Sequence, residues 1–176
     1  MGNSRNGCAD QYICISHDAQ QTRRIIKIAK PRETKLTTAQ FLMTGSAAII
    51  GMLGFMHMIL TFRGPKLLPR DASLKLVMNT VFPVITTQTN YWRMWVGFNA
   101  SHSMGAMLFG LIYAYLAVAH SELLFHSVFL QCVGFAVLVG FALLAKLYWF
   151  ITPLVGATVS LLLYIGSLAM AWTAWA

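Results

Sequence analysis

Residues 90–119 read NYWRMWVGFNASHSMGAMLFGLIYAYLAVA, an apolar stretch longer than the roughly 20 helical residues that cross a bilayer. This stretch nevertheless contains the polar residues Asn99, Ser101, His102 and Ser103. Hydrocarbon cannot hydrogen-bond a carboxamide or an imidazole, so polar side chains at this depth normally turn into a helix bundle and often mark a functional site. The stretch therefore predicts a membrane-spanning helix that contributes to an inward polar site.

The composition of the whole chain is typical of a membrane protein. Of its 176 residues, 57% are hydrophobic and only 10% are charged. The 13 Lys and Arg residues outnumber the 5 Asp and Glu residues, but they stand beside apolar stretches, where lipid headgroups are nearer partners than nucleic acid. Cys8, Cys14 and Cys132 form no CxxC pair. We expect no nucleic-acid binding, no disulfide framework and no cysteine metal site.

Four apolar stretches predict an all-α fold, an integral membrane four-helix bundle in contact with the lipid bilayer. The predicted spans are residues 39–62, 94–119, 123–145 and 150–173, and together they form one transmembrane domain over residues 39–176. Tyr, Trp, Lys and Arg residues flank the second, third and fourth spans, as is usual at the level of the headgroups.

The polar, basic residues 1–38 predict a leader that is disordered and lies on the headgroups. An alternative is that translation begins at Met43, in which case residues 1–42 are not part of the protein. Four spans place both ends of the domain on one side of the membrane. The leader is slightly more basic than the first loop, so the positive-inside rule predicts a cytoplasmic leader, and a start at Met43 would reverse this orientation.

The first loop, residues 63–93, contains a predicted amphipathic helix. Two prolines near its start exclude a continuous helix there, and Asp71 is placed to cap a helix that reaches Phe82. Lys75 and Asn79 fall on the polar side of this helix. Its apolar side consists of Leu74, Val77, Met78 and Val81. This pattern predicts a helix that lies either on the membrane surface or over the mouth of the bundle.

The predicted ligand-binding site consists of His57, Asn99, His102, Ser103 and Tyr113. At 1.5 Å per residue, His57 lies about 8 to 9 Å below the face with the long loop, and His102 about 12 to 13 Å below it. On a helical wheel the other three residues share one side of the second span with His102. The two imidazoles and this polar side can therefore face each other inside the bundle.

Further small and polar residues are expected to face inward. Ala47 and Gly51 form a small-xxx-small pair that lets a neighbouring helix approach the first span closely. Polar residues on the third and fourth spans are expected to reach the interior from the other side. These are Ser127, Gln131, Ser160 and Tyr164.

Three hypotheses remain open for the polar site. In the first, the polar residues only hold the helices together, at about 0.6 kcal/mol per contact, and the protein is an accessory subunit of a membrane complex. In the second, His57 and His102 ligate the iron of a haem b or flank a quinone, although their depths differ by about 4 Å. In the third, His102 and Asn99 anchor a small or lipid-like ligand or belong to a proton path.

An enzyme is the less favoured interpretation. Ser101 and Ser103 are neighbours of His102 in sequence, but adjacent residues on a helix do not face each other. The spans offer no carboxylate to orient a catalytic base, and no third ligand of suitable type stands at the depth that a zinc site would need. We therefore predict no catalytic residues, and a metal only if His57 and His102 hold a haem.

Several short runs in the chain form a recognisable pattern. They are GPKL at 64–67, PRD at 69–71, YW at 91–92, GFNASHSMGA at 97–106 and YWF at 148–150. On these runs the chain resembles a functionally uncharacterised family of small bacterial four-span membrane proteins, with GFNASHSxGA as its signature. The resemblance covers about residues 39–176 and implies a multi-pass protein of the bacterial inner membrane. It implies no activity and no cofactor.

Overall fold

The computed structural model describes Lys35 and residues 37–175, and all regular secondary structure within that part of the chain is helical. Four of the described helices are long and apolar enough to cross a membrane. They are Thr37–Arg63, α3 (Tyr91–Ala119), α5 (Val128–Tyr148) and α6 (Ile151–Trp175). This confirms the predicted all-α four-helix membrane bundle. Most of the predicted leader, residues 1–38, lies outside the described residues.

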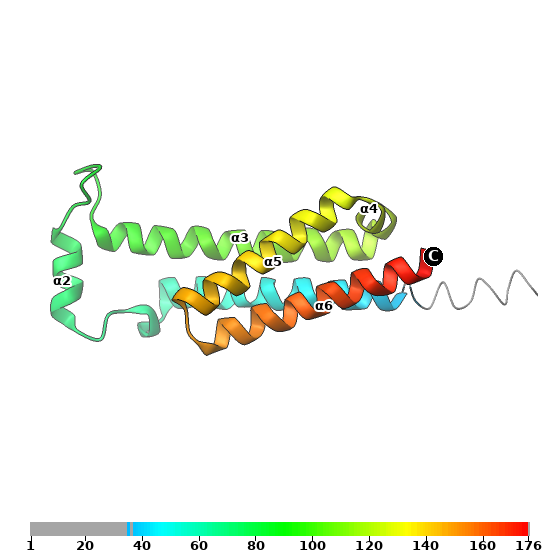
Figure 1. Cartoon of the computed structure of the whole chain (residues 1–176). Helices are drawn as coiled ribbons and strands as arrows, with labels where there is room; N and C mark the ends of the chain where they lie inside the picture. The colour runs from blue at the N-terminus through cyan, green and yellow to red at the C-terminus, as the bar shows by residue number, and fades with distance from the viewer. Residues whose placement is uncertain (1–34, 36, 176) are drawn as a thin grey trace, which may run out of the picture.

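The four long helices run alternately in opposite directions and form one elongated bundle (Figure 1). The first helix packs against α3 and α6, α5 packs against α6, and a hydrogen bond joins α3 to α5. The long first loop and the turn between α5 and α6 lie at one end of the bundle, and α4 (Ser121–His126) lies at the other (Figure 1). At the α4 end, Lys35 Nζ donates to the carbonyl of Thr173 at 3.1 Å. The beginning and end of the described chain therefore lie side by side.

The third span differs from its predicted limits of 123–145. A separate short helix, α4, covers its first residues, and α5 begins only at Val128. Ser127 causes the break, because its backbone is extended and its side chain accepts a hydrogen bond from Leu130 N, which caps α5. Leu124 and Phe125 of α4 are buried, so α4 closes this end of the bundle.

The first loop contains a short 3₁₀ helix, η1 (Pro65–Leu67), and the predicted amphipathic helix, α2 (Ala72–Thr80). Asp71 caps α2 by accepting from Ser73 N at 2.8 Å. Hydrogen bonds from the Ser73 hydroxyl and then from its backbone N–H lower the pKa of Asp71, which keeps the capping carboxylate charged. The helix lies across the end of the bundle (Figure 1). Leu74, Leu76 and Val77 are exposed, and Met78 is partly exposed. It is therefore a surface helix that does not bury its apolar side on the bundle.

The first helix and α3 approach each other closely at small residues. A Cβ added at Gly54 would lie 2.8 Å from Ala106 Cβ, and one added at Gly110 would lie 2.7 Å from the carbonyl oxygen of Ala47 and from Gly51 Cα. Because lipid tails are as apolar as side chains, close packing of this kind is a main source of helix association in a membrane. The predicted role of Ala47 and Gly51 is confirmed, with α3 as the neighbouring helix.

Hydrogen bonds between serines join the first helix to α6. Ser46 and Ser160 are both fully buried, and each hydroxyl donates to the other residue's carbonyl oxygen, at 2.8 and 2.9 Å. One heptad away, Ser167 Oγ donates to the carbonyl of Ala39 at 2.7 Å. The serine hydroxyls thus link the backbones of the antiparallel first helix and α6 by hydrogen bonds, and the same bonds satisfy the hydroxyl donors.

We expect Gly110→Ala to destabilise the bundle by about 1–3 kcal/mol, because the new methyl group would meet backbone atoms of the first helix. Reversible unfolding in mixed detergent micelles measures this change. Gly105→Ala on the same helix is the matched control, since a Cβ there meets nothing within 4 Å. The control should be neutral or slightly stabilising. Equal stability of the two variants would contradict the close approach of these helices.

Candidate functional site

The candidate site begins with a hydrogen bond between the first helix and α3, where Nε2 of His57 lies 2.9 Å from Oδ1 of Asn99. Asn99 is buried, and its Nδ2 donates to the carbonyl of Trp95 at 2.7 Å, one turn earlier on α3. A carbonyl oxygen only accepts, so the amide nitrogen of Asn99 must face Trp95 and its Oδ1 must face His57. The orientation of the carboxamide is therefore fixed by its surroundings.

This orientation determines the protonation of the His57 ring. Oδ1 of Asn99 is an acceptor, so Nε2 of His57 carries a hydrogen and donates it. In the neutral ring, Nδ1 is then left as an acceptor. The pair is therefore a directional contact in which His57 donates and Asn99 accepts.

The ring of His102 lies at the centre of an aromatic group. Its centroid is 5.7 Å from that of His57, 5.5 Å from that of Phe141 on α5, and 4.7 Å from that of Trp149 in the α5–α6 turn. All three rings meet it edge to face. The imidazole is half-buried, and its nitrogens form no hydrogen bond within residues 37–175. His102 thus has packing partners but keeps its hydrogen-bonding capacity.

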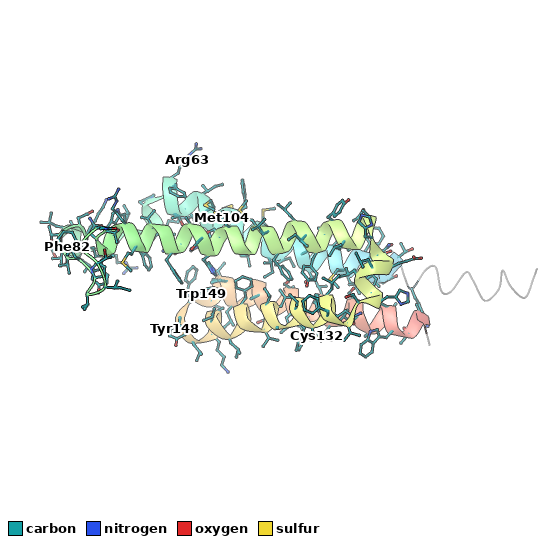
Figure 2. The ribbon with its side chains drawn as sticks, turned by 90° about the horizontal axis from the view of Figure 1, so that it is seen from above. Arg63, Phe82, Met104, Cys132, Tyr148 and Trp149 are labelled. Atoms are coloured by element: carbon teal, nitrogen blue, oxygen red, sulfur yellow. The ribbon has the colours of Figure 1, made fainter. Side chains whose placement is uncertain are left out.

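The contact with Trp149 places the site near the end of the bundle that carries the first loop. Trp149 follows the last residue of α5, and in Figure 2 it lies nearer the bundle than Phe82, which is beyond the start of α3. From His102, α3 extends back to Tyr91, about 16 Å at 1.5 Å per residue. The site therefore lies near the level at which α5 finishes and α6 begins, and the first turns of α3 extend beyond the site.

Two further polar groups near the site are used by the helices themselves. Ser103 is fully buried, and its Oγ donates to the carbonyl of Asn99 at 2.8 Å. Thr61 Oγ1 donates to the carbonyl of His57 at 2.8 Å. Hydroxyls that bond the carbonyl four residues earlier have their donors occupied. Ser103, a predicted site residue, is therefore next to the site but faces its own helix.

Tyr113, the other predicted site residue, belongs to a second polar cluster. It lies about 16 Å from His102 along α3, its ring stacks on Phe109 with centroids 4.4 Å apart, and its hydroxyl donates to the carbonyl of Leu130 at 2.7 Å. The ring of Tyr164 is 6.2 Å away. The structure thus brings His57, Asn99 and His102 together and places Tyr113 in a separate group.

The second cluster is internally satisfied. Tyr164 donates to the carbonyl of Gln131 at 2.8 Å, Gln131 Nε2 donates to the carbonyl of Phe125 at 2.7 Å, and Trp172 Nε1 donates to Gln131 Oε1 at 3.3 Å. A Cβ at Gly134 would meet the hydroxyl of Tyr164 and the ring of Tyr113. The predicted inward position of Gln131 and Tyr164 is confirmed, and their bonds join α4, α5 and α6.

The residues at the candidate site do not fit a haem held between His57 and His102. The two imidazoles are in direct ring contact at nearly a right angle, and Nε2 of His57 is occupied by Asn99. One turn deeper, the backbones of the two helices meet at Gly54 and Ala106, so a macrocycle would have to separate them.

Sequence reasoning missed Phe141 and Trp149. Trp149 was expected only to mark the headgroup level, yet the α5–α6 turn and the first loop lie at the same end of a four-span bundle, which would have placed it near His57 and His102. Phe141 carries no such signal, because its contact depends on which face of α5 meets α3. The site is therefore richer in aromatic surface than its polar residues indicate.

Among residues 37–175, no three His, Cys, Asp or Glu side chains gather in a way that could hold a metal ion. Comparisons with protein-family models, with curated proteins and with solved structures give no match to this chain. The chemistry of the site is that of an imidazole pair, a fixed carboxamide and two large aromatic rings.

We expect the neutral ring of His57 to be the Nε2–H tautomer, because Asn99 presents only an acceptor to it. Nitrogen NMR of protein labelled at its histidine rings measures the tautomer, and His57→Ala assigns the signal. Asn99→Ala removes the acceptor and should mix the two tautomers. Detection of His57 as the Nδ1–H form in the unmodified protein would contradict the proposed orientation of the carboxamide.

Proposed function

We propose that this chain is a multi-pass membrane protein that binds a small or lipid-like molecule at His102, beside His57 and Asn99. The observation that carries this proposal is the state of the His102 ring. It is half-buried among aromatic side chains without a hydrogen bond in the described chain, whereas Asn99 and Ser103 have their donors occupied. A ligand that pairs with the imidazole supplies the contact that the protein itself does not.

The chemistry of the site supports an amphipathic ligand. A neutral imidazole offers one donor and one acceptor, and His57 adds an acceptor at Nδ1, so the ligand head carries a hydroxyl, a carbonyl or a carboxylic acid. Phe141 and Trp149 offer flat apolar surface beside His102, which suits an apolar ring or chain. A lipid, a fatty acid and a quinone all belong to this class.

The resemblance to the bacterial four-span family supports the same assignment. The GFNASHS run, residues 97–103, supplies Asn99 and His102, and the adjacent turn of α3 packs on the first helix. We propose that the chain belongs to this family and lies in the bacterial inner membrane. The proposed role is non-enzymatic, and subunits of a larger membrane complex are further partners in this proposal.

We expect a small molecule to co-purify with the protein and to be lost in the His102→Phe variant, which keeps a ring against Phe141 and Trp149 but has no nitrogen. Mass spectrometry of an organic extract of each preparation in mild detergent, normalised to protein, measures retention. We expect a loss of about tenfold, equal to about 1.4 kcal/mol of binding free energy.

Ser101→Ala is the matched control for this experiment. Ser101 is next to His102 in sequence but exposed, and its hydroxyl donates to the carbonyl of Phe98 at 3.0 Å. It should retain the molecule. If wild type, control and variant all carry the same molecules, the site serves only to pack helices, as in an accessory subunit. A Soret band in the visible spectrum that is lost with His102 would instead establish the haem alternative.

A further inference from the structure

The first loop carries an unbalanced charge. Between residues 63 and 93 its acidic side chains are limited to Asp71. Its basic side chains are Arg63, Lys66, Arg70, Lys75 and Arg93. All of these except Lys75 are exposed, and Lys75 is partly exposed. The loop therefore presents a positive surface at one end of the bundle.

The same segment exposes large apolar side chains. Leu74 and Val77 on α2 are 50% and 51% exposed, and Val84 and Ile85 in the following turn are 107% and 87% exposed. No described element of the chain covers them. Cations together with exposed apolar groups on one short segment are the combination by which peripheral segments bind membrane surfaces.

The position of α2 is fixed by contacts with the beginning of α3. Asn90 Nδ2 donates to the carbonyl of Asn79 at 2.9 Å, and Tyr91 N donates to the carbonyl of Val81 at 3.2 Å. Lys75 Nζ lies 5.0 Å from the centre of the Trp92 ring. Asn90 also caps α3 by accepting from Arg93 N. These contacts hold α2 in a defined position. The helix lies across the bundle axis, parallel to the plane of a membrane that the bundle spans (Figure 1).

We propose that residues 64–90 bind the anionic phospholipid headgroups of the membrane that the protein spans. Phosphates of anionic lipids pair with the cations, and the apolar side chains of α2 and of the turn after it enter the layer between headgroups and acyl chains. The negative charge of these headgroups complements the positive charge of the first loop, which favours anionic lipid over other partners for this surface. A second copy of the chain would bring an equally basic loop to the same surface, and like charges would repel it.

The experiment uses the full chain with its native cysteines replaced by serine and with Ile85→Cys labelled by a polarity-sensitive fluorophore. The protein is placed in lipid nanodiscs of phosphatidylcholine, with or without phosphatidylglycerol. We expect a blue shift of the emission with phosphatidylglycerol, much smaller without it, and reversed by high salt because screening weakens charge attraction. The same label at Leu111→Cys, on the exposed side of α3 within the span, should not respond to the lipid composition.

The charge dependence is tested with the double variant Lys66→Glu/Arg70→Glu. We expect this variant to need roughly tenfold more phosphatidylglycerol for half of the response. Lys66→Arg/Arg70→Lys keeps the charge and is the matched control. An equal blue shift in both lipids would overturn headgroup recognition in favour of apolar insertion alone. No blue shift in either lipid would overturn the proposal and indicate a segment that faces water or a protein partner.

Discussion

The close approach of the first helix and α3 is the contact on which the rest of the structure depends. Within a bilayer, burial of apolar surface contributes little to helix association, because the lipid is as apolar as the side chains, so close packing and hydrogen bonds must hold the bundle together. Gly54 and Gly110 allow backbone to meet backbone along this interface. This approach brings Nε2 of His57 to 2.9 Å from Oδ1 of Asn99, about one helical turn closer to the first loop than Gly54. The small residues thus create the geometry in which the polar site can exist.

Most polar side chains inside the bundle serve its assembly, and this distinguishes His102 from them. Ser46 and Ser160 satisfy each other, and Tyr164 bonds a backbone carbonyl of α5. Ser103 bonds its own helix. In hydrocarbon, an unsatisfied polar group is costly, so sequences that place polar residues in spans normally place their partners as well. His102 differs from these residues because its ring has aromatic neighbours but no hydrogen bond in the described chain, and this difference is the basis of the proposed ligand site.

The bundle could be predicted from the sequence because long apolar stretches and small residues determine it locally, but the site could be predicted only in part. The helical wheel predicted the side of α3 on which Tyr113 lies but not its partner. It therefore grouped Tyr113 with His102, although Tyr113 belongs to another cluster. The break at Ser127 was not expected, because a short apolar helix and the start of a span have the same composition. Trp149 and Phe141 reach the site because α5 packs beside α3. The periodicity of the sequence does not predict which face of one helix packs against another.

The spans differ in length, and this places the candidate site away from the start of α3. With 21 residues, α5 is about 31 Å long, whereas α3 has 29 residues and is about 43 Å long. Trp149 follows the end of α5 and contacts His102, so the imidazole lies level with that end of α5, about 16 Å from the start of α3 along its axis. Phe141 offers apolar surface at this level, which supports the proposal of an amphipathic ligand over that of a wholly polar solute.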